Sequence, residues 1–415
     1  TILLALSVYT LVEFLAERAA GNTATMLFTD SRMWYAPLNI HYAVGVDGVS
    51  VAMLLLSSII VFAGVFASWK INPLPKEYFL WFMLLSTGVF GFFISVDLFT
   101  MFMFYEVALI PMYLLIGVWG SGRKNYSAMK LTLMLMGGSA LLMIGILGIY
   151  YQSGLHSMNV VEIAEHGNIP MNWQYFLFPM TFVGFGVLGA MFPFHTWSPD
   201  GHASAPTAVS MLHAGVLMKL GGYGCFRVAI YLMPQAATEL AWIFLILTGI
   251  SVVYGAFSAC VQTDLKYINA YSSVSHCGLV LFAILMLNTT AMTGAVMQML
   301  SHGLMCIRDS VGSPGIEWLR CRNDYIRRFV RAYRYVPPSV YHRSLYFDCD
   351  YGGLYFAGCR QTFVRRCSKR TSPGVDRCRM VGTSVGYYLD RMRGRYRLFP
   401  ELDFRFDSSR CGTYN

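Results

Sequence analysis

The chain has 415 residues, of which 56% are hydrophobic and only 13% are charged. About a quarter of the residues of a soluble domain are charged, so this composition excludes an ordinary soluble enzyme and favours an integral membrane protein. The net charge of +9 is unevenly distributed. Residues 1–306 contain 10 basic and 12 acidic residues, whereas residues 307–415 contain 21 basic and 10 acidic ones.

Apolar runs of the length that crosses a bilayer, about 20 residues, follow one another through the first part of the chain. We predict ten spans, the first and last of them incomplete, and therefore an all-α, polytopic bundle of membrane helices. The runs are Thr1–Phe14, Val49–Trp69, Tyr78–Ser95, Leu98–Trp119, Leu131–Tyr151, Tyr175–Phe194, Pro206–Leu232, Leu240–Val261, Ile268–Leu287, and one from Ala291 that ends near Met305.

The basic residues of the loops predict the orientation of this bundle. If the spans alternate in direction, Lys70 and Lys76, the loop 123–130 and Lys266 all lie on one side. Cytoplasmic loops carry an excess of Lys and Arg, so this side is predicted to be cytoplasmic. The loops on the opposite side are near neutral or acidic.

The two ends of the chain do not fit a complete membrane protein. Thr1 lies inside an apolar run without an initiator Met, so we expect the natural start to lie elsewhere. The apolar pattern stops in mid-helix near residue 306, and the tail contains 20 Arg but a single Lys. We predict a transmembrane domain at 1–306 and a non-membrane tail at 307–415, interpreted as frameshifted or foreign sequence. The alternative is a basic arm for nucleic acid or anionic lipid.

Four ionisable residues lie near the centres of predicted spans or inside the last run: Glu106, Lys219, His276 and His302. A charge at the bilayer centre costs about 2.5–3.5 kcal/mol on insertion scales, so such residues usually mark a partner or a conduction path. Lys219 is the natural partner for Glu106, and histidine titrates near neutral pH. We predict that the four form a lateral proton relay. The alternative is that each only fixes helix packing.

Metal and cofactor sites are not expected in the apolar part. His195, His202 and His213 lack a Cys or carboxylate cluster around them, which makes a metal site a weak hypothesis. We predict instead a tight, polar loop between helices at residues 195–202. No glycine-rich nucleotide fingerprint, haem motif or iron–sulfur pattern occurs in residues 1–306, so we expect no redox centre in this chain.

Several motifs, taken in order, resemble the antiporter-like membrane subunits of proton-pumping NADH-quinone oxidoreductase, respiratory complex I. The resemblance is to the chain M type, whose mitochondrial counterpart is subunit four, and covers roughly residues 45–305. The motifs are Phe104–Tyr113, Pro193–Asp200, Ala205–Ala208, Leu217–Gly224, Gln262–Lys266 and Tyr271–His276.

This resemblance implies two inverted five-helix repeats, each with a broken helix, the second repeat being largely missing here. It implies that Glu106 is the mid-membrane glutamate, Lys219 the central lysine, and His276 and His302 the relay histidines. The family also has a lysine on the helix before the Pro-Phe-His motif, where this chain has Leu188. His213 is then a candidate substitute cation.

The implied function is proton translocation coupled to quinone reduction elsewhere in the complex, so the chain is an enzyme only as a subunit of a translocase. NADH, FMN, iron–sulfur clusters and quinone belong to partner subunits. The expected partners are other membrane subunits of the complex, above all neighbouring antiporter-like ones, and the lipid bilayer. Nucleic acid is not an expected partner. The expected location is the inner membrane of a bacterium rather than of a mitochondrion. Three alternatives remain: a subunit of a multi-subunit Na+/H+ antiporter, a subunit of an energy-converting hydrogenase, and a structural membrane anchor.

Overall fold

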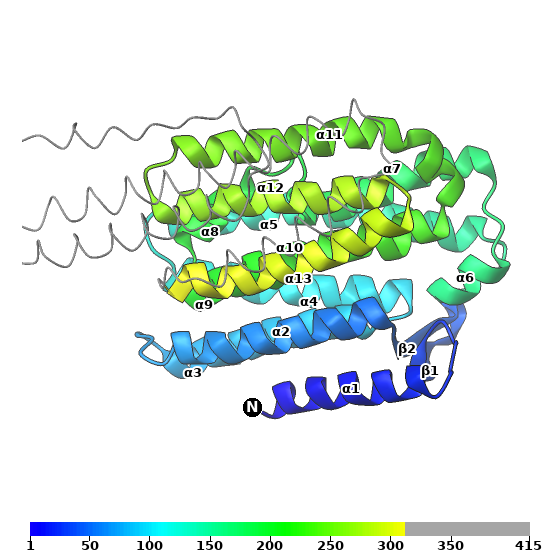
Figure 1. The fold of residues 1–415 in the computed structure, drawn as a ribbon, viewed down its shortest axis with the longest axis horizontal. Helices are drawn as coiled ribbons and strands as arrows, with labels where there is room; N and C mark the ends of the chain where they lie inside the picture. The colour runs from blue at the N-terminus through cyan, green and yellow to red at the C-terminus, as the bar shows by residue number, and fades with distance from the viewer. Residues whose placement is uncertain (312–415) are drawn as a thin grey trace, which may run out of the picture. The chain divides into compact units, whose positions relative to one another are not determined.

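The structure is a computed structural model that describes residues 1–311, so the predicted tail lies almost entirely outside the described residues. Long helices run side by side and form a bundle (Figure 1). The long helices are α1 (Ile2–Ala19), α2 (Gly48–Ala67), α3 (Pro75–Ile94), α4 (Leu98–Trp119), α5 (Lys124–Gln152), α7 (Met171–Leu188), α11 (Pro234–Val261), α12 (Leu265–Leu285) and α13 (Thr289–Val311).

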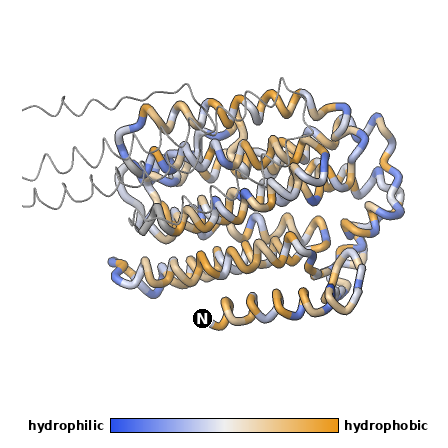
Figure 2. Tube along the Cα trace, viewed as in Figure 1, coloured by the Kyte–Doolittle hydropathy of each residue, from blue (hydrophilic) through white to orange (hydrophobic). Residues whose placement is uncertain are grey.

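Apolar residues cover most of the length of these helices, and polar residues gather at the two ends of the bundle (Figure 2). Among the described helices, six are long and apolar enough to cross a membrane: α2, α3, α4, α5, α11 and α12. Each of the ten predicted runs overlaps helix, although the run Tyr175–Phe194 continues past the end of α7, so the prediction of a helical bundle is confirmed. The last helix, α13, continues to Val311, beyond the predicted end of its apolar run.

The predicted architecture did not include a β-hairpin, which precedes α2. Its strands, β1 (Leu27–Tyr35) and β2 (Ile40–Val46), pair in antiparallel fashion, and the short helix η1 (Ala36–Leu38) joins them. Most of β1 is exposed, and its apolar residues are grouped at its two ends around the polar run 29–32, so the segment lacks the hydrophobic alternation by which a strand is detected. The hairpin is tied to α4 because Asp97 accepts a hydrogen bond from the backbone nitrogen of His41, 3.3 Å away.

The segment predicted as a polar loop between His195 and His202 folds into a short helix, α8 (Trp197–Ser204), which is packed inside the protein. The indole of Trp197 is buried and donates a hydrogen bond to the Val187 carbonyl at 3.1 Å. Lys130 of α5 pairs with Asp200 at 2.8 Å. A proline is tolerated in the first turn of a helix, so Pro199 does not prevent this fold. A second short helix, α6 (Val160–His166), lies at the other end of the bundle (Figure 1).

The helix that carries Lys219 runs without a break from Thr207 to Ile230, but its winding changes along its length. It consists of α9 (Thr207–Leu212), the π-helical stretch η2 (His213–Leu217), α10 (Met218–Gly224) and a second π-helical stretch, η3 (Cys225–Ile230). Single π-helical turns are rare and frequently occur at functional sites.

Candidate functional site

Lys219 is the most deeply buried charge of the candidate site, with 2% of its surface exposed. Its ammonium group donates hydrogen bonds to the Ala214 carbonyl, which belongs to η2, and contacts Nδ1 of His302 on α13. The side chain also lines a cavity of about 10 Å³ together with Cys277 and Met299, which is room for about one water molecule. A buried charge of this kind requires hydrogen-bonding partners, and Lys219 has them.

His302 and His276 extend this contact towards α12. His302 is 2% exposed, and its ring centroid lies 4.8 Å from that of His276. Nδ1 of His276 is 2.8 Å from the amide nitrogen of Gln298, and Nε2 of His302 is 3.7 Å from Sγ of Cys306. Three of the four predicted residues are thus neighbours, in the order Lys219, His302, His276. Gln298 was missed by the sequence analysis because an amide does not titrate.

His213 is buried, and neither of its ring nitrogens has a hydrogen-bond partner among the described residues. Its ring is stacked between two others: the Trp197 centroid lies 5.2 Å away and the His202 centroid 4.1 Å away. Nδ1 of His202 is 3.2 Å from the Ser210 hydroxyl. Burial, and then the positive charge of Lys219, lower the pKa of His202, which lies on α8 between the spanning helices, to about 3.

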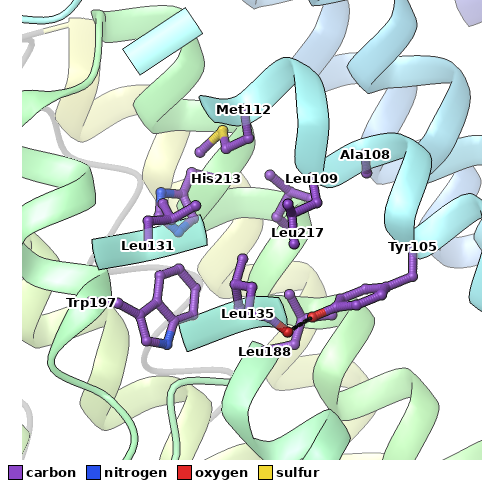
Figure 3. Close-up of a pocket in the computed structure, with 10 residues that line it drawn as sticks. All are labelled: Tyr105, Ala108, Leu109, Met112, Leu131, Leu135, Leu188, Trp197, His213 and Leu217. Atoms are coloured by element: carbon purple, nitrogen blue, oxygen red, sulfur yellow. Dashed lines mark hydrogen bonds between the residues drawn. The ribbon is translucent and has the colours of Figure 1, made fainter. Parts of the chain in front are cut away.

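A second cavity of about 10 Å³ lies between α4 and His213. Tyr105 and Leu188 line it from one side and His213 and Trp197 from the other, and Tyr105 uses its hydroxyl to donate a hydrogen bond to the Leu135 carbonyl at 3.0 Å (Figure 3). Leu188 therefore borders a space that is shared by the helix of Glu106 and the helix of Lys219. This space is large enough for about one water molecule.

Glu106 stands apart from the other predicted residues. Its Oε1 atom is buried and has no hydrogen-bond partner, and no ion pair joins Glu106 to Lys219 in the described part of the chain. One turn further along α4, Ile110 is 57% exposed, so Glu106 lies beside an outward-facing stripe of this helix. The structure does not form the Glu106–Lys219 contact that the sequence suggests, because the ammonium group of Lys219 is directed towards His302.

Arg227 is a further buried charge on the Lys219 helix that the sequence analysis missed. It pairs with Asp47 at 2.5 Å. The signal was available in the sequence, since Arg227 lies in the same apolar run as Lys219. Within the described residues, no group of three or more His, Cys, Asp or Glu side chains is arranged to hold a metal ion.

The sequence profile of the transmembrane family "NADH:quinone oxidoreductase/Mrp antiporter" matches residues 95–328, more than half of the chain. The chain belongs to this family. Among curated members, it is 39% identical over 277 residues to NAD(P)H-quinone oxidoreductase chain 4 3 of Picosynechococcus sp., covering 66% of this chain and 50% of that protein. It is 36% identical over 301 residues to NADH-quinone oxidoreductase subunit M of Rickettsia bellii, covering 72% of this chain and 60% of that protein.

This member of the NADH:quinone oxidoreductase/Mrp antiporter family therefore spans 50–60% of the length of these two relatives. Two solved structures share its fold. Respiratory complex I from Thermus thermophilus matches with a TM-score of 0.72 and 19% identity, covering 85% of this chain and 82% of the other. The Mrp complex from Dietzia sp. matches with a TM-score of 0.71 and 16% identity, covering 88% and 74%.

Proposed function

We propose that the chain acts as a membrane subunit of a proton-pumping NADH:quinone oxidoreductase and carries protons through the bilayer interior. The observation that carries the proposal is the contact of Lys219 with His302, whose ring lies 4.8 Å from that of His276. Relatives at 36% identity and above are named as subunits of quinone oxidoreductases, which favours this function over a Na+/H+ antiporter or a hydrogenase subunit. The Thermus and Dietzia folds match almost equally well, so the fold alone does not separate these alternatives.

In the proposed mechanism, Lys219 gives a proton to Nδ1 of neutral His302, with which its ammonium is in contact. Protonated His302 then passes a proton towards His276 and becomes neutral again. With less positive charge beside it, neutral Lys219 can take up a new proton. His213 and the cavity beside it lie on the α8 side of Lys219 and supply the entry route. Charges interact strongly over short distances in a protein interior, so a change in the charge of Glu106 alters the free energy of each step.

The redox chemistry would be performed by partner subunits, and neighbouring antiporter-like subunits are the proposed partners. The proposed location is the inner membrane of a bacterium, with the loop that contains Lys70 and the end of α12 that contains Lys266 in the cytoplasm.

The proposal is tested by substituting Lys219→Ala in the assembled complex and measuring the NADH-driven proton gradient in membrane vesicles. The expected loss of proton transport is about tenfold or more, as for the removal of other positioned proton-transfer groups. Lys70→Ala is the matched control because Lys70 is exposed in a loop. Normal assembly and unchanged pumping in Lys219→Ala would favour the structural anchor instead, and NADH-driven uptake of Na+ in place of protons would favour an Na+-transporting subunit.

A further inference from the structure

The surroundings of Lys219 differ on its two sides along the helix. Towards α9, the helix has polar and titratable groups, including His213, and the preceding helix α8 carries Asp200, which pairs with Lys130 of α5. Towards η3, aromatic rings follow. Figure 1 shows that α8 and the β-hairpin lie at opposite ends of the bundle, so the two directions lead to opposite sides of the membrane.

Four buried rings, one of them from the helix itself, form a layer on the hairpin side of Lys219. Tyr223 lies one turn after Lys219, and its ring centroid is 5.2 Å from that of Phe93 and 5.9 Å from that of Phe92. The Phe185 ring packs against Phe92 with a centroid distance of 6.3 Å. All four are almost completely buried. Gly224 is in such close contact with Phe185 that an added Cβ would overlap the ring. This layer is therefore closely packed.

A buried ion pair lies directly behind the layer. Arg227 pairs with Asp47 at 2.5 Å, and their side chains are only 6% and 17% exposed. Nε and Nη2 of Arg227 each lie 3.4 Å from the Tyr223 hydroxyl, which also lies 2.8 Å from the hydroxyl of Ser50. Asp47 in turn caps α2, accepting a hydrogen bond from the Ser50 nitrogen at 2.8 Å. The guanidinium is thus held in one position by two helices.

An arginine stays charged at every accessible pH, so Arg227 cannot take up a proton from Lys219, and its ion pair occupies the carboxylate of Asp47. No hydrogen bond joins Lys219 to Tyr223 in the described part of the chain. We propose that Phe92, Phe93, Phe185, Tyr223 and the Arg227–Asp47 pair form a seal that prevents protons on Lys219 from reaching the hairpin side of the membrane. This inference rests on the proposed function: protons that arrive at Lys219 then leave only through His302.

The test measures passive proton permeability of vesicles that contain the assembled complex, with an imposed pH gradient and no NADH. The double substitution Asp47→Asn and Arg227→Gln removes both charges together and leaves neither one unpaired. The matched control is Asp30→Asn with Arg32→Gln, which neutralises an exposed pair on the hairpin. We expect permeability to rise several-fold in the first double variant and to stay at the wild-type level in the control. Adding Lys219→Ala to the first double variant is expected to abolish the leak.

An unchanged permeability with an assembled complex would overturn the seal, and so would a leak that persists after Lys219→Ala, because such a leak bypasses the relay. If the double variant does not accumulate, Phe93→Ala opens the aromatic layer without a change of charge and is expected to give a smaller leak that also requires Lys219. The assay uses no NADH. Loss of NADH-driven pumping in Lys219→Ala tests the proposed function separately, so the two hypotheses can fail independently.

Discussion

At the scale of single residues, the histidines of this protein differ because their neighbours differ. His302 contacts Lys219, His276 lies 2.8 Å from the Gln298 amide, and His213 is stacked between two rings with no hydrogen bond among the described residues. His202 is the clearest case: it is buried, near a positive charge, and its pKa is lowered to about 3. The same residue type therefore has three different surroundings in one bundle: a lysine ammonium, a side-chain amide and two stacked rings.

The lowered pKa of His202 predicts a dependence of stability on pH. The ordinary pKa of histidine is 6.5, so between that value and about 3 the unfolded chain binds a proton that the folded chain does not. The free energy of unfolding therefore falls as the pH decreases through this window, by about 1.4 kcal/mol per pH unit at most. We expect His202→Asn, which can still reach Ser210, to weaken this fall. Melting temperatures of the solubilised wild-type and His202→Asn complexes, recorded from about pH 7 to pH 5, measure this fall in stability. The same dependence of melting temperature on pH in the two complexes would contradict the prediction.

At the scale of helices, close contact between α10 and α7 depends on the absence of a side chain at Gly221. A Cβ there would lie 2.6 Å from the Phe185 carbonyl oxygen, and closer still to the backbone of Gly189. Because backbone atoms cannot rotate away as a side chain can, the two helices would have to separate. That separation would move α10 as a whole, and Lys219 with it.

We therefore expect Gly221→Ala to destabilise the protein by about 1–3 kcal/mol or more, the usual cost of overpacking, and to reduce the amount of assembled complex. Gly137→Ala on α5 is the matched control, since a Cβ at Gly137 meets no atom within 4 Å. There the gain in helix propensity, about 1 kcal/mol at most, is expected to leave stability unchanged or slightly higher. Native gels and melting temperatures compare the two variants, and equal effects at both sites would show that the α10–α7 contact is not tight.

At the scale of the whole molecule, the segments whose basic residues predict a cytoplasmic location lie together at one end of the bundle. The loop with Lys70 and the α8 end with Lys130 lie at one end of the bundle, and the hairpin lies at the other (Figure 1). Figure 2 shows polar residues concentrated at these two ends. Membership of a transmembrane family and six described helices of spanning length support a placement of the bundle across the membrane, with its two ends at the two surfaces.

This placement predicts opposite labelling from the two sides of the membrane. Lys70→Cys and Arg32→Cys each create an exposed thiol, one in the α2–α3 loop and one in the hairpin. A membrane-impermeable maleimide is expected to label Lys70→Cys only from the cytoplasmic side and Arg32→Cys only from the opposite side. Inside-out and right-side-out vesicles provide the two conditions. Labelling of both thiols from the same side would refute the orientation.

The positions of the helices could be predicted from the sequence because a bilayer requires about 20 apolar residues in a row, whatever their partners. All ten predicted runs overlap helix in the structure. The relay candidates Glu106, Lys219, His276 and His302 could likewise be chosen from the sequence, since a titratable group in an apolar run carries an energetic cost. The hairpin and α8 could not, because their strands and turns are stabilised by contacts with distant segments such as Asp97 and Lys130.

The sequence by itself determined which segments are apolar enough to span a bilayer and which ionisable residues lie within them, because hydropathy is a property of the local chain. Only the tertiary structure decided their partners. It brought Lys219 to His302, 83 residues away in sequence, left the buried Oε1 atom of Glu106 without a hydrogen-bond partner among the described residues, and paired Arg227 with Asp47. These pairings depend on which faces of separate helices meet, and that is set by the packing of the whole bundle.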